Sequence, residues 1–372
     1  MKLTILASNL EKAIGVTSRS VASRPQLPVL ANIKLSASKQ GLEALSTDLE
    51  IGFKVNVGAK VEEEGEITVE ARTLSELIKT LPAGKVSIET EKEILKLSSD
   101  GVDVELPGIG AGEFPSIPSL EGEGQMEMSA DRLRKVVGRV SSSAATDESR
   151  PVLTGMLWEV GKKNMVMVAT DGYRLSKDKV KISKVDEDLV GKKMVIPSRA
   201  LVELVRVMEE GVDKVIGQLQ EEKQQVIFQA GEIELVSRLL SGEFPPYEQI
   251  MPEGHEVKVR VVTEEFEEAV KRAAIFARDS ANIIKIKVED GELIVSANSA
   301  QVGKSRTRLS GEVEGSGLEV AFNSRYLLDY FKAVETEEIE MESLGGLKPG
   351  VFKQVGESKD WVQVIMPVRV QK

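Results

Sequence analysis

The sequence predicts an α+β fold in which three similar domains follow one another, each made of antiparallel sheet and two short helices. Three observations lead to this prediction. One helical pattern recurs three times, a second recurs in step with it, and runs of alternating apolar residues fill the segments between them. The repeat spans roughly 120–130 residues, far longer than a solenoid unit, so each copy is expected to have its own core.

Helices are expected at two places in each copy. The first pattern carries Ser or Thr near its start, as a helix N-cap does, and continues as an amphipathic helix at residues 7–14, 129–137 and 263–270. The second pattern reads Arg-x-Leu-x-acid-apolar. It starts at Arg72, returns 127 residues later at Arg199 and returns again 126 residues after that at Arg325.

Strands are expected where apolar and polar residues alternate. Clear examples are residues 42–46, 86–88, 95–97, 165–169 and 293–297. The phrase Gly-Glu-Phe-Pro closes two copies, at 112–115 and 242–245, and linkers rich in Gly and Glu or containing Pro follow at 121–124 and 252–254. We therefore expect domains at 1–122, 123–253 and 254–372.

Composition excludes several classes of site. The chain has 49 Lys and Arg against 60 Asp and Glu, and the resulting net charge of −11 means that any DNA contact must come from a local basic patch. It has no cysteine, which excludes disulfides, thiolate metal sites and cysteine nucleophiles, and its single histidine, His255, cannot build a His-rich metal site. No phosphate-binding loop or Gly-x-Ser-x-Gly motif occurs. We expect no catalytic residue, no metal and no cofactor.

The hydrophobic pattern predicts a cytoplasmic protein. Residues 1–5 lack the long apolar run of a signal peptide, and no apolar stretch approaches the length of about 18 residues that a membrane helix needs. We expect no contact with a membrane.

Four segments, in order along the chain, resemble the bacterial DNA polymerase III beta subunit family, the sliding clamps. They are Ser-Arg-Pro-Gln-Leu-Pro-Val-Leu at 23–30, Thr-Asp-Gly-Tyr-Arg-Leu-Ser at 170–176, Gly-Glu-Phe-Pro at 242–245 and Val-Ile-Met-Pro-Val-Arg-Val at 364–370. The resemblance covers the whole chain. It implies a head-to-tail homodimer that closes a six-domain ring around double-stranded DNA, with helices lining the hole. It also implies partners: the DNA polymerase III alpha subunit, the clamp-loader ATPase complex, and other polymerases and repair proteins.

Basic residues on the expected helices are candidates for DNA contacts in such a ring. Arg132, Lys135 and Arg139 fall at i, i+3 and i+7 beside an apolar stripe, although an ordinary solvated helix face has the same pattern. Arg72 and Arg199 occupy matching places in two copies. A ring is held on DNA by topology, so weak phosphate contacts suffice and an acidic exterior is acceptable. The expected inner-wall residues are Arg24, Arg72, Arg132, Lys135, Arg139 and Arg199.

The resemblance also implies a hydrophobic cleft for partner peptides between the second and third domains. The sequence Thr-Asp-Gly-Tyr-Arg-Leu at 170–175 belongs to the second copy alone, so the repeated fold does not require it, yet an Asp-Gly turn between strands would explain part of it. The expected cleft residues are Arg150, Leu153, Thr170, Gly172, Tyr173, Arg174, Leu175, Pro245, Ile250, Asn323, Tyr326, Val364, Met366, Pro367, Val368 and Arg369.

The C-terminal segment has two interpretations. It is expected to be a last strand that ends at a sheet edge, where Pro367 stops the ladder, and it also leaves apolar side chains for a peptide. Gln371 and Lys372 extend beyond the usual end of the family, and Pro151-Val152 stands where some relatives carry aromatic residues that touch DNA.

Two other functions remain open at this point. Acidic runs at 62–64 and 337–338 could provide paired carboxylates for a strand-rich hydrolase, which would lose turnover when one carboxylate is replaced. A structural repeat protein without DNA contact would be indifferent to closed circular DNA.

Overall fold

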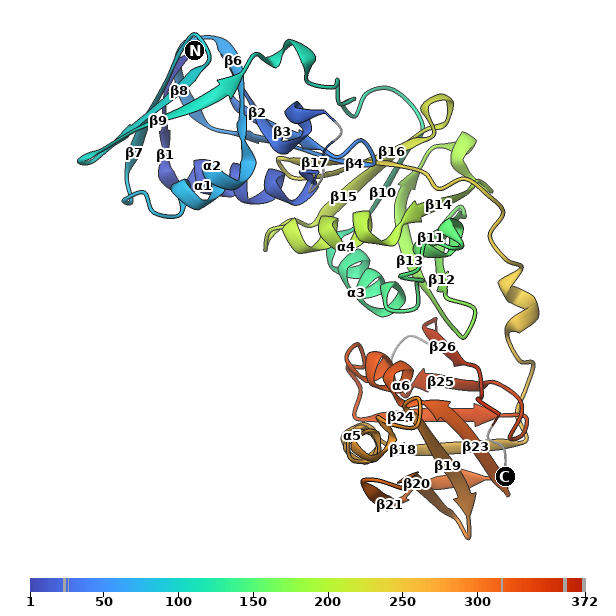
Figure 1. The fold of residues 1–372 in the computed structure, drawn as a ribbon. Coiled ribbons are helices and arrows are strands. Elements are labelled where there is room, and N and C mark those ends of the chain that lie inside the picture. The colour runs from blue at the N-terminus through green and yellow to red at the C-terminus, as the bar shows by residue number, and fades with distance from the viewer. Residues whose placement is uncertain (23–24, 26, 316, 357–359, 370–372) are drawn as a thin grey trace. The chain divides into compact units, whose positions relative to one another are not determined.

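The computed structural model describes residues 1–22, 25, 27–315, 317–356 and 360–369 (Figure 1). The chain divides into two compact units. The first unit consists of Met1–Ala130, Ile182–Val190 and Arg199–Leu239, and the second consists of Asp131–Lys181, Gly191–Ser198 and Leu240–Lys372. None of the helices within the described ranges combines the length and the apolar composition that a membrane crossing requires.

Six α-helices lie in the described ranges, and each coincides with one of the predicted helical patterns. They are α1 Ala7–Thr17, α2 Ala71–Ile78, α3 Ala130–Ser141, α4 Ser198–Val207, α5 Thr263–Ala277 and α6 Ser324–Phe331. Short 3-10 turns are η1 Ser18–Ser20, η2 Pro28–Ala31, η3 Ala111–Glu113, η4 Pro151–Thr154, η5 Glu187–Leu189, η6 Glu221–Lys223 and η7 Tyr247–Ile250.

The predicted Ser/Thr N-caps are wrong for α1 and α5. The N-cap residues are Leu6 and Val262, and neither provides a side-chain hydrogen bond. Both helices follow directly on a strand, so the capping position falls on the last residue of that strand. Side-chain caps occur instead in the second pattern, where the Glu70 carboxylate accepts hydrogen bonds at the start of α2 and the Asn323 side chain accepts one at the start of α6.

Antiparallel strands of the first unit form two sheets that share β9. One sheet has the order β5-β1-β7-β8-β9, and the other has the order β9-β6-β2-β3-β4-β17-β16-β15-β10-β13. The strands are β1 Lys2–Leu6, β2 Asn32–Ser38, β3 Gly41–Thr47, β4 Ile51–Val57, β5 Ala59–Glu63, β6 Gly65–Glu70, β7 Lys85–Glu91, β8 Ile94–Ser99, β9 Val102–Ile109, β10 Gln125–Ser129, β15 Lys214–Gln220, β16 Gln225–Ala230 and β17 Ile233–Arg238.

The second unit also has two antiparallel sheets. Their orders are β14-β11-β12-β13-β26-β25-β24-β18-β22 and β21-β20-β19-β23. The strands are β11 Gly155–Val160, β12 Asn164–Thr170, β13 Arg174–Val185, β14 Lys193–Pro197, β18 Val257–Val262, β19 Ile283–Glu289, β20 Glu292–Ser299, β21 Gly303–Ser310, β22 Glu312–Glu314, β23 Leu318–Asn323, β24 Glu338–Ser343, β25 Gly350–Gln354 and β26 Val362–Ile365. The residues of β13 up to Lys181 belong to this unit.

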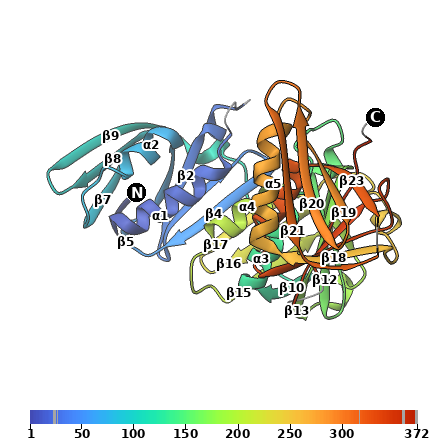
Figure 2. The same ribbon diagram turned by 90° about the horizontal axis from the view of Figure 1, so that it is seen from below.

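Helices cover the inner faces of the sheets and close the cores. In the first unit α1 packs on β3, β4 and α2. In the second unit α5 packs on β19, β20 and β21 and on α6, and Figure 2 shows α5 running beside β20 and β21. Phe266 of α5 and Phe331 of α6 meet edge to face with ring centroids 5.4 Å apart.

The last strand does not lie at a sheet edge, so that prediction is wrong. β26 pairs with β25 on one side and with β13 on the other, where Arg174 lies opposite Ile365 and Leu175 opposite Val364. Alternation in a sequence identifies a strand but carries no information about how many neighbours the strand has.

Candidate functional site

The ladder between β13 and β26 brings together much of the predicted peptide site. The loop from Thr170 to Arg174 precedes β13, and the Thr170 hydroxyl accepts a hydrogen bond from the Gly172 N–H (3.0 Å). Gly172 has φ +88°, a left-handed conformation that glycine adopts without strain. The Met366 N–H, just beyond β26, donates to the Tyr173 carbonyl (2.8 Å). The loop and the C-terminal segment are therefore held side by side.

The Arg174 side chain fastens this loop to α6. Its guanidinium donates to Asp171 (3.1 Å) and to Asp329 of α6 (2.7 Å), and its Cζ lies 4.5 Å from the centre of the Tyr326 ring. Burial alone would raise the pKa of Asp329, but hydrogen bonds from Lys332 and Arg174 outweigh it and lower that pKa. Asp329 is therefore held in its charged form, and Arg174 is fixed from two sides.

An apolar cluster lies beneath the loop. Leu175 and Val364 pack with Leu157, Val168, Val195 and Tyr247, and all six are buried. By contrast, Tyr173 is 67% exposed and Met366 is 36% exposed. We name Tyr173, Met366, Pro367 and Val368 the junction surface, because they provide the accessible apolar area above the cluster. The predicted walls Leu175 and Val364 belong to this buried cluster, and Leu153 is also buried but is not a member of it.

The other predicted cleft residues surround this group. Pro245 and Ile250 are half-buried, beside and within η7, and Asn323 caps α6. The Val368 N–H donates to the Ala321 carbonyl (2.8 Å), which ties the C-terminal segment to β23. Arg150 and Arg369 are exposed, and among the described residues neither side chain has a hydrogen bond or ion pair to the junction surface.

The basic face predicted for α3 is only partly correct. Lys135 is exposed and pairs with Glu335 (2.8 Å). Arg139 is 2% exposed, and its guanidinium lies against the buried Asp178 (3.2 Å) and over the Trp361 ring (4.9 Å). Arg132, a quarter exposed, binds the same Asp178 carboxylate (2.6 Å). The expectation that Arg139 faces solvent is therefore wrong, because a buried carboxylate on β13 holds it in the interior.

The repeated arginines of the second pattern keep equivalent positions. Arg72, Arg199 and Arg325 are each the second residue of their helix, and all three are exposed. Arg72 pairs with Glu76 of its own helix (3.1 Å), and Arg199 pairs with Asp48 (2.9 Å). Arg24 lies outside the described residues.

Sequence reasoning missed a second group of cations in the first unit. Arg19, Lys79 and Arg206 line a hollow of about 550 Å³ together with residues of α1. Arg206 lies seven residues after Arg199 on α4, a spacing that places both on one side of a helix and could have identified it. Arg19 and Lys79 lie just after α1 and α2, where no helical pattern indicates their direction.

Three consecutive stretches of the chain match one family. Residues 1–118 match the N-terminal domain of the DNA polymerase III beta subunit, residues 127–246 its central domain and residues 248–369 its C-terminal domain. The beta sliding clamp of Bacillus subtilis strain 168 is 31% identical over 384 residues, which cover 99% of this chain and all of that protein. The chain belongs to the beta sliding clamp family.

Other relatives agree with this assignment. The Staphylococcus aureus (strain Mu50) beta sliding clamp is 29% identical over 383 residues, covering 99% of both chains. Crystal structures of the Bacillus subtilis and Pseudomonas aeruginosa clamps superpose with TM-scores of 0.94 and 0.92 at 29% and 28% identity, each over the full length of both chains.

The family membership decides several predictions. The α+β fold of three clamp domains is confirmed. As a sliding clamp the chain is a non-enzymatic processivity factor, so the hydrolase hypothesis is wrong. Within the described residues, no group of three or more His, Cys, Asp or Glu side chains is arranged to hold a metal ion.

Proposed function

We propose that two copies of this clamp join head to tail, first domain to third domain, and enclose duplex DNA in a ring of six domains. The match of all three consecutive domains to the family carries this proposal. We place the domain boundaries near residues 122 and 253, of which 122 falls between the first two matched stretches and 253 lies five residues after the start of the third. A heterologous contact that closes after two copies leaves no free interface, so the assembly stops at a dimer.

We propose that the ring retains DNA by encircling it and makes only weak contacts with the DNA itself. Arg72, Arg132, Lys135 and Arg199 each have a carboxylate partner, so a phosphate must compete with Glu76, Asp178, Glu335 or Asp48 for the cation. Such contacts are weak, similar at every position along the duplex and sensitive to salt. Retention then depends on topology, and the ring is free to slide.

The junction surface is proposed to bind short peptides of the partners. These are the DNA polymerase III alpha subunit, the clamp-loader ATPase complex and other polymerases and repair proteins. Exposed Tyr173 and Met366 suit Leu or Phe anchors, since burial of one large apolar side chain contributes about 1.5–3 kcal/mol. One or two anchors, less the cost of ordering a flexible peptide, give micromolar binding that lets partners exchange.

We place the clamp in the cytoplasm. The supporting observation is its membership in a family of replication proteins, whose partners act on chromosomal DNA.

The decisive experiment separates topology from affinity. Clamp loaded onto nicked circular DNA is expected to remain bound, and it is expected to leave the same DNA after linearisation. Equal retention on circular and open-ended linear DNA would reject encirclement. Light scattering of the free protein is expected to report about twice the chain mass of 40.6 kDa.

A further inference from the structure

A short series of polar contacts connects α6 to the loop that carries Tyr173. The Asp329 carboxylate on α6 accepts a hydrogen bond from the Arg174 guanidinium (2.7 Å), and the same guanidinium donates through Nε to Asp171 (3.1 Å). The other carboxylate oxygen of Asp171 accepts from the backbone N–H of Tyr173 (2.9 Å). Asp329 is therefore connected to Tyr173 through two other side chains.

The Arg174 guanidinium is held on three sides. Asp171 and Asp329 bind its Nε and one of its Nη atoms, and the centre of the Tyr326 ring lies 4.5 Å from its Cζ. Only 11% of the Arg174 side chain is exposed. A planar guanidinium that bonds to two carboxylates has a fixed orientation, which the single ammonium group of a lysine cannot reproduce. Arg174 therefore fixes the loop relative to α6.

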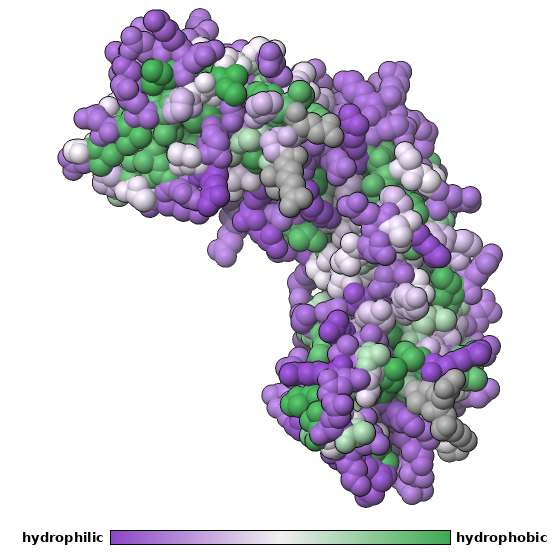
Figure 3. Space-filling view, viewed as in Figure 1, coloured by the Kyte–Doolittle hydropathy of each residue, from purple (hydrophilic) through white to green (hydrophobic). Residues whose placement is uncertain are grey.

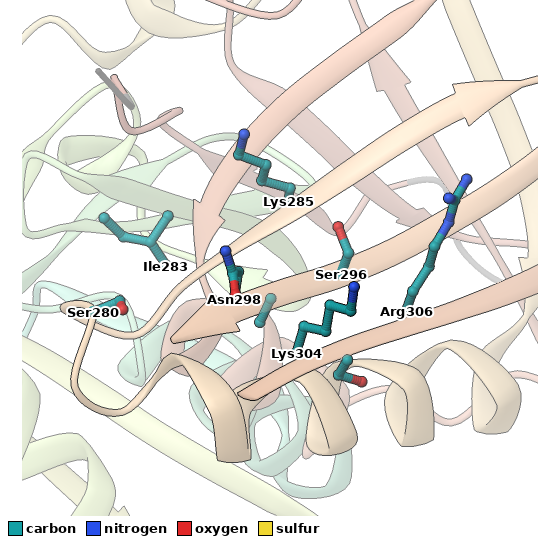
Figure 4. Close-up of a pocket in the computed structure, with 9 residues that line it drawn as sticks. Ser280, Ile283, Lys285, Ser296, Asn298, Lys304 and Arg306 are labelled. Carbon is teal, nitrogen blue, oxygen red and sulfur yellow. The ribbon is translucent and has the colours of Figure 1, made fainter. Parts of the chain in front are cut away.

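A group of more open cations in the third domain provides a contrast. Lys285, Lys304 and Arg306 line a cavity of about 730 Å³, and Figure 4 shows these side chains projecting from β19 and β21. The described residues that line this cavity include no carboxylate. Arg174, in contrast, has two carboxylates at hydrogen-bond distance, so its charge is already neutralised inside the protein. Its effect on a bound peptide is therefore expected to come from the position in which it holds the loop.

The first two domains carry the same loop, and each loop is linked to the second helix of the next domain. The Asp48 carboxylate accepts hydrogen bonds from the N–H groups two and three residues later (3.0 and 2.8 Å), as the Asp171 carboxylate does (2.9 Å each). Where the first and second domains meet, the first junction, Asp48 binds Arg199 of α4 directly (2.9 Å). Where the second and third domains meet, the second junction, the helix provides the carboxylate, Asp329, and the loop provides the arginine, Arg174. A link between loop and helix is thus a repeated part of the fold, and the second junction has its own form of it.

The junction surface depends on the position of this loop. Its accessible apolar area comes from four residues, and Figure 3 shows apolar residues interspersed with hydrophilic ones where Figure 1 labels α6 and β25. The Met366 N–H is bonded to the Tyr173 carbonyl, so a shift of the loop moves the two exposed side chains together and away from their supports. A site of a few apolar side chains binds well only when the surrounding residues hold those side chains in place.

We propose that Asp329 is a positioning residue of the peptide site, which acts through Arg174 to hold Tyr173 in the arrangement that partner peptides bind. The proposal rests on the peptide site proposed above and adds to it a residue that lies outside the predicted cleft. Asp329 does not belong to the junction surface, and Arg174 and Asp171 lie between it and Tyr173. The pair of Asp329 and Arg174 differs from an ordinary surface ion pair, because the arginine is nearly buried and solvent screens it little.

Removal of one charge tests the positioning role. Asp329→Asn keeps the size of the side chain and removes the carboxylate. It is expected to raise the Kd of a labelled Gln-x-x-Leu-x-Phe peptide about tenfold in fluorescence anisotropy, because a charge-assisted hydrogen bond that holds the loop is lost. Asp329→Glu provides a carboxylate again and is expected to recover most of the affinity. Each variant is measured under conditions where circular dichroism shows it fully folded, so a loss of stability alone leaves Kd unchanged.

A double-mutant cycle tests whether Asp329 acts through Arg174. Arg174→Lys keeps a cation but loses the planar contact with two carboxylates, and it is expected to weaken peptide binding to a similar extent. In the Arg174→Lys background, Asp329→Asn is expected to change Kd by less than about twofold, since the contact through which it acts is already lost. Losses that add independently in the double variant would show that Asp329 affects the peptide by another route, and would overturn the inference.

The first junction provides the matched control. Asp48→Asn removes a carboxylate that links the equivalent loop to an arginine of a helix, and it is expected to leave the peptide Kd unchanged. An equal loss of affinity in Asp48→Asn would indicate general damage and overturn the inference, and so would a wild-type Kd in Asp329→Asn. A wild-type chain that does not bind the peptide at all would overturn the proposed peptide site itself.

Discussion

Deletion of residues 366–372 is expected to weaken peptide binding at least about tenfold and to leave dimerisation intact. The deletion removes Met366, Pro367 and Val368 from the junction surface and leaves β26, which ends at Ile365. Tyr173 then loses the segment that lies beside it. The proposed contact between copies, first domain to third domain, is expected to lie outside residues 366–372 and therefore to persist.

The contacts of the deleted segment determine how much stability and how much peptide affinity the deletion is expected to remove. The deleted segment makes two backbone hydrogen bonds, from Met366 to Tyr173 and from Val368 to Ala321. Each contributes about 0.5–1.5 kcal/mol, so the loss of stability is expected to stay within about 1–3 kcal/mol. An apolar peptide anchor that loses its wall loses about 1.5–3 kcal/mol of burial, and since 1.4 kcal/mol is tenfold in affinity, Kd is expected to rise at least about tenfold.

Fluorescence anisotropy with a labelled peptide of the type Gln-x-x-Leu-x-Phe, run beside light scattering, measures the two effects separately. Removal of residues 370–372 alone is the matched control and is expected to leave Kd unchanged. Met366→Ala keeps the backbone hydrogen bond to Tyr173 and removes the side chain, so it is expected to reproduce part of the loss. If the truncated dimer bound the peptide as tightly as the full chain, the junction surface would be only a strand end.

Three further predictions follow from the ion pairs. Asp178→Ala is expected to destabilise the fold by about 3–5 kcal/mol in urea unfolding, because it removes the buried carboxylate that pairs with the Arg139 guanidinium, while Glu335, which remains at 3.6 Å, is half-exposed; an unchanged midpoint would contradict this. Lys135→Glu with Arg199→Glu is expected to weaken DNA binding and to reduce the slope of log K against log salt by about 2, with normal folding because both side chains are exposed. Asp329→Asn is expected to lower the urea midpoint at neutral pH. The lowered pKa of Asp329 gives stability above its unfolded value of about 3.9 that is lost as pH falls through the folded value, so the two midpoints are expected to converge in acid.

The helices and many strands could be predicted from the sequence because their periodicity is local. All six helical patterns became helices, and the run at 165–169 lies within β12. The N-caps could not be predicted in α1 and α5, since a strand runs straight into each helix and leaves no turn for a capping side chain. The pairing of β26 with β13 could not be predicted either, because it joins residues more than 180 positions apart in the sequence.

In the candidate site, the sequence likewise predicted the positions of the basic residues on α3 but not their burial. Spacing correctly placed Lys135 on the exposed side of α3, and it placed Arg139 there wrongly. Seven residues advance a helix by nearly two full turns, so Arg132 and Arg139 do share a direction, and that direction meets Asp178. The carboxylate that decides their burial comes from β13, about 40 residues away in sequence, and no helical periodicity reports it. Replacing Arg132, Lys135 and Arg139 together by Glu is therefore expected to damage the fold, so the loss of DNA binding in such a variant would not identify a DNA contact.

The loop after Thr47 in the first domain is equivalent to the loop after Thr170 in the second, because each threonine hydroxyl accepts a hydrogen bond from the N–H two residues later. This repeat explains why partner peptides are expected at the second junction and not at the first. In the first domain Leu49 occupies the left-handed position (φ +75°) that Gly172 takes in the second. There the linker residues Ile117 and Pro118 line, with Leu49 and Val236, a cavity of only about 160 Å³, and Ile117 also packs on the cluster around Phe114. The linker at Ile117 and Pro118 therefore covers the first-domain loop that contains Leu49. At the second junction the equivalent position is followed by Tyr173, which is 67% exposed, and Met366 of the neighbouring segment is 36% exposed. Two copies of one loop therefore have different surroundings, and the residues beside each loop decide whether a partner peptide can reach it.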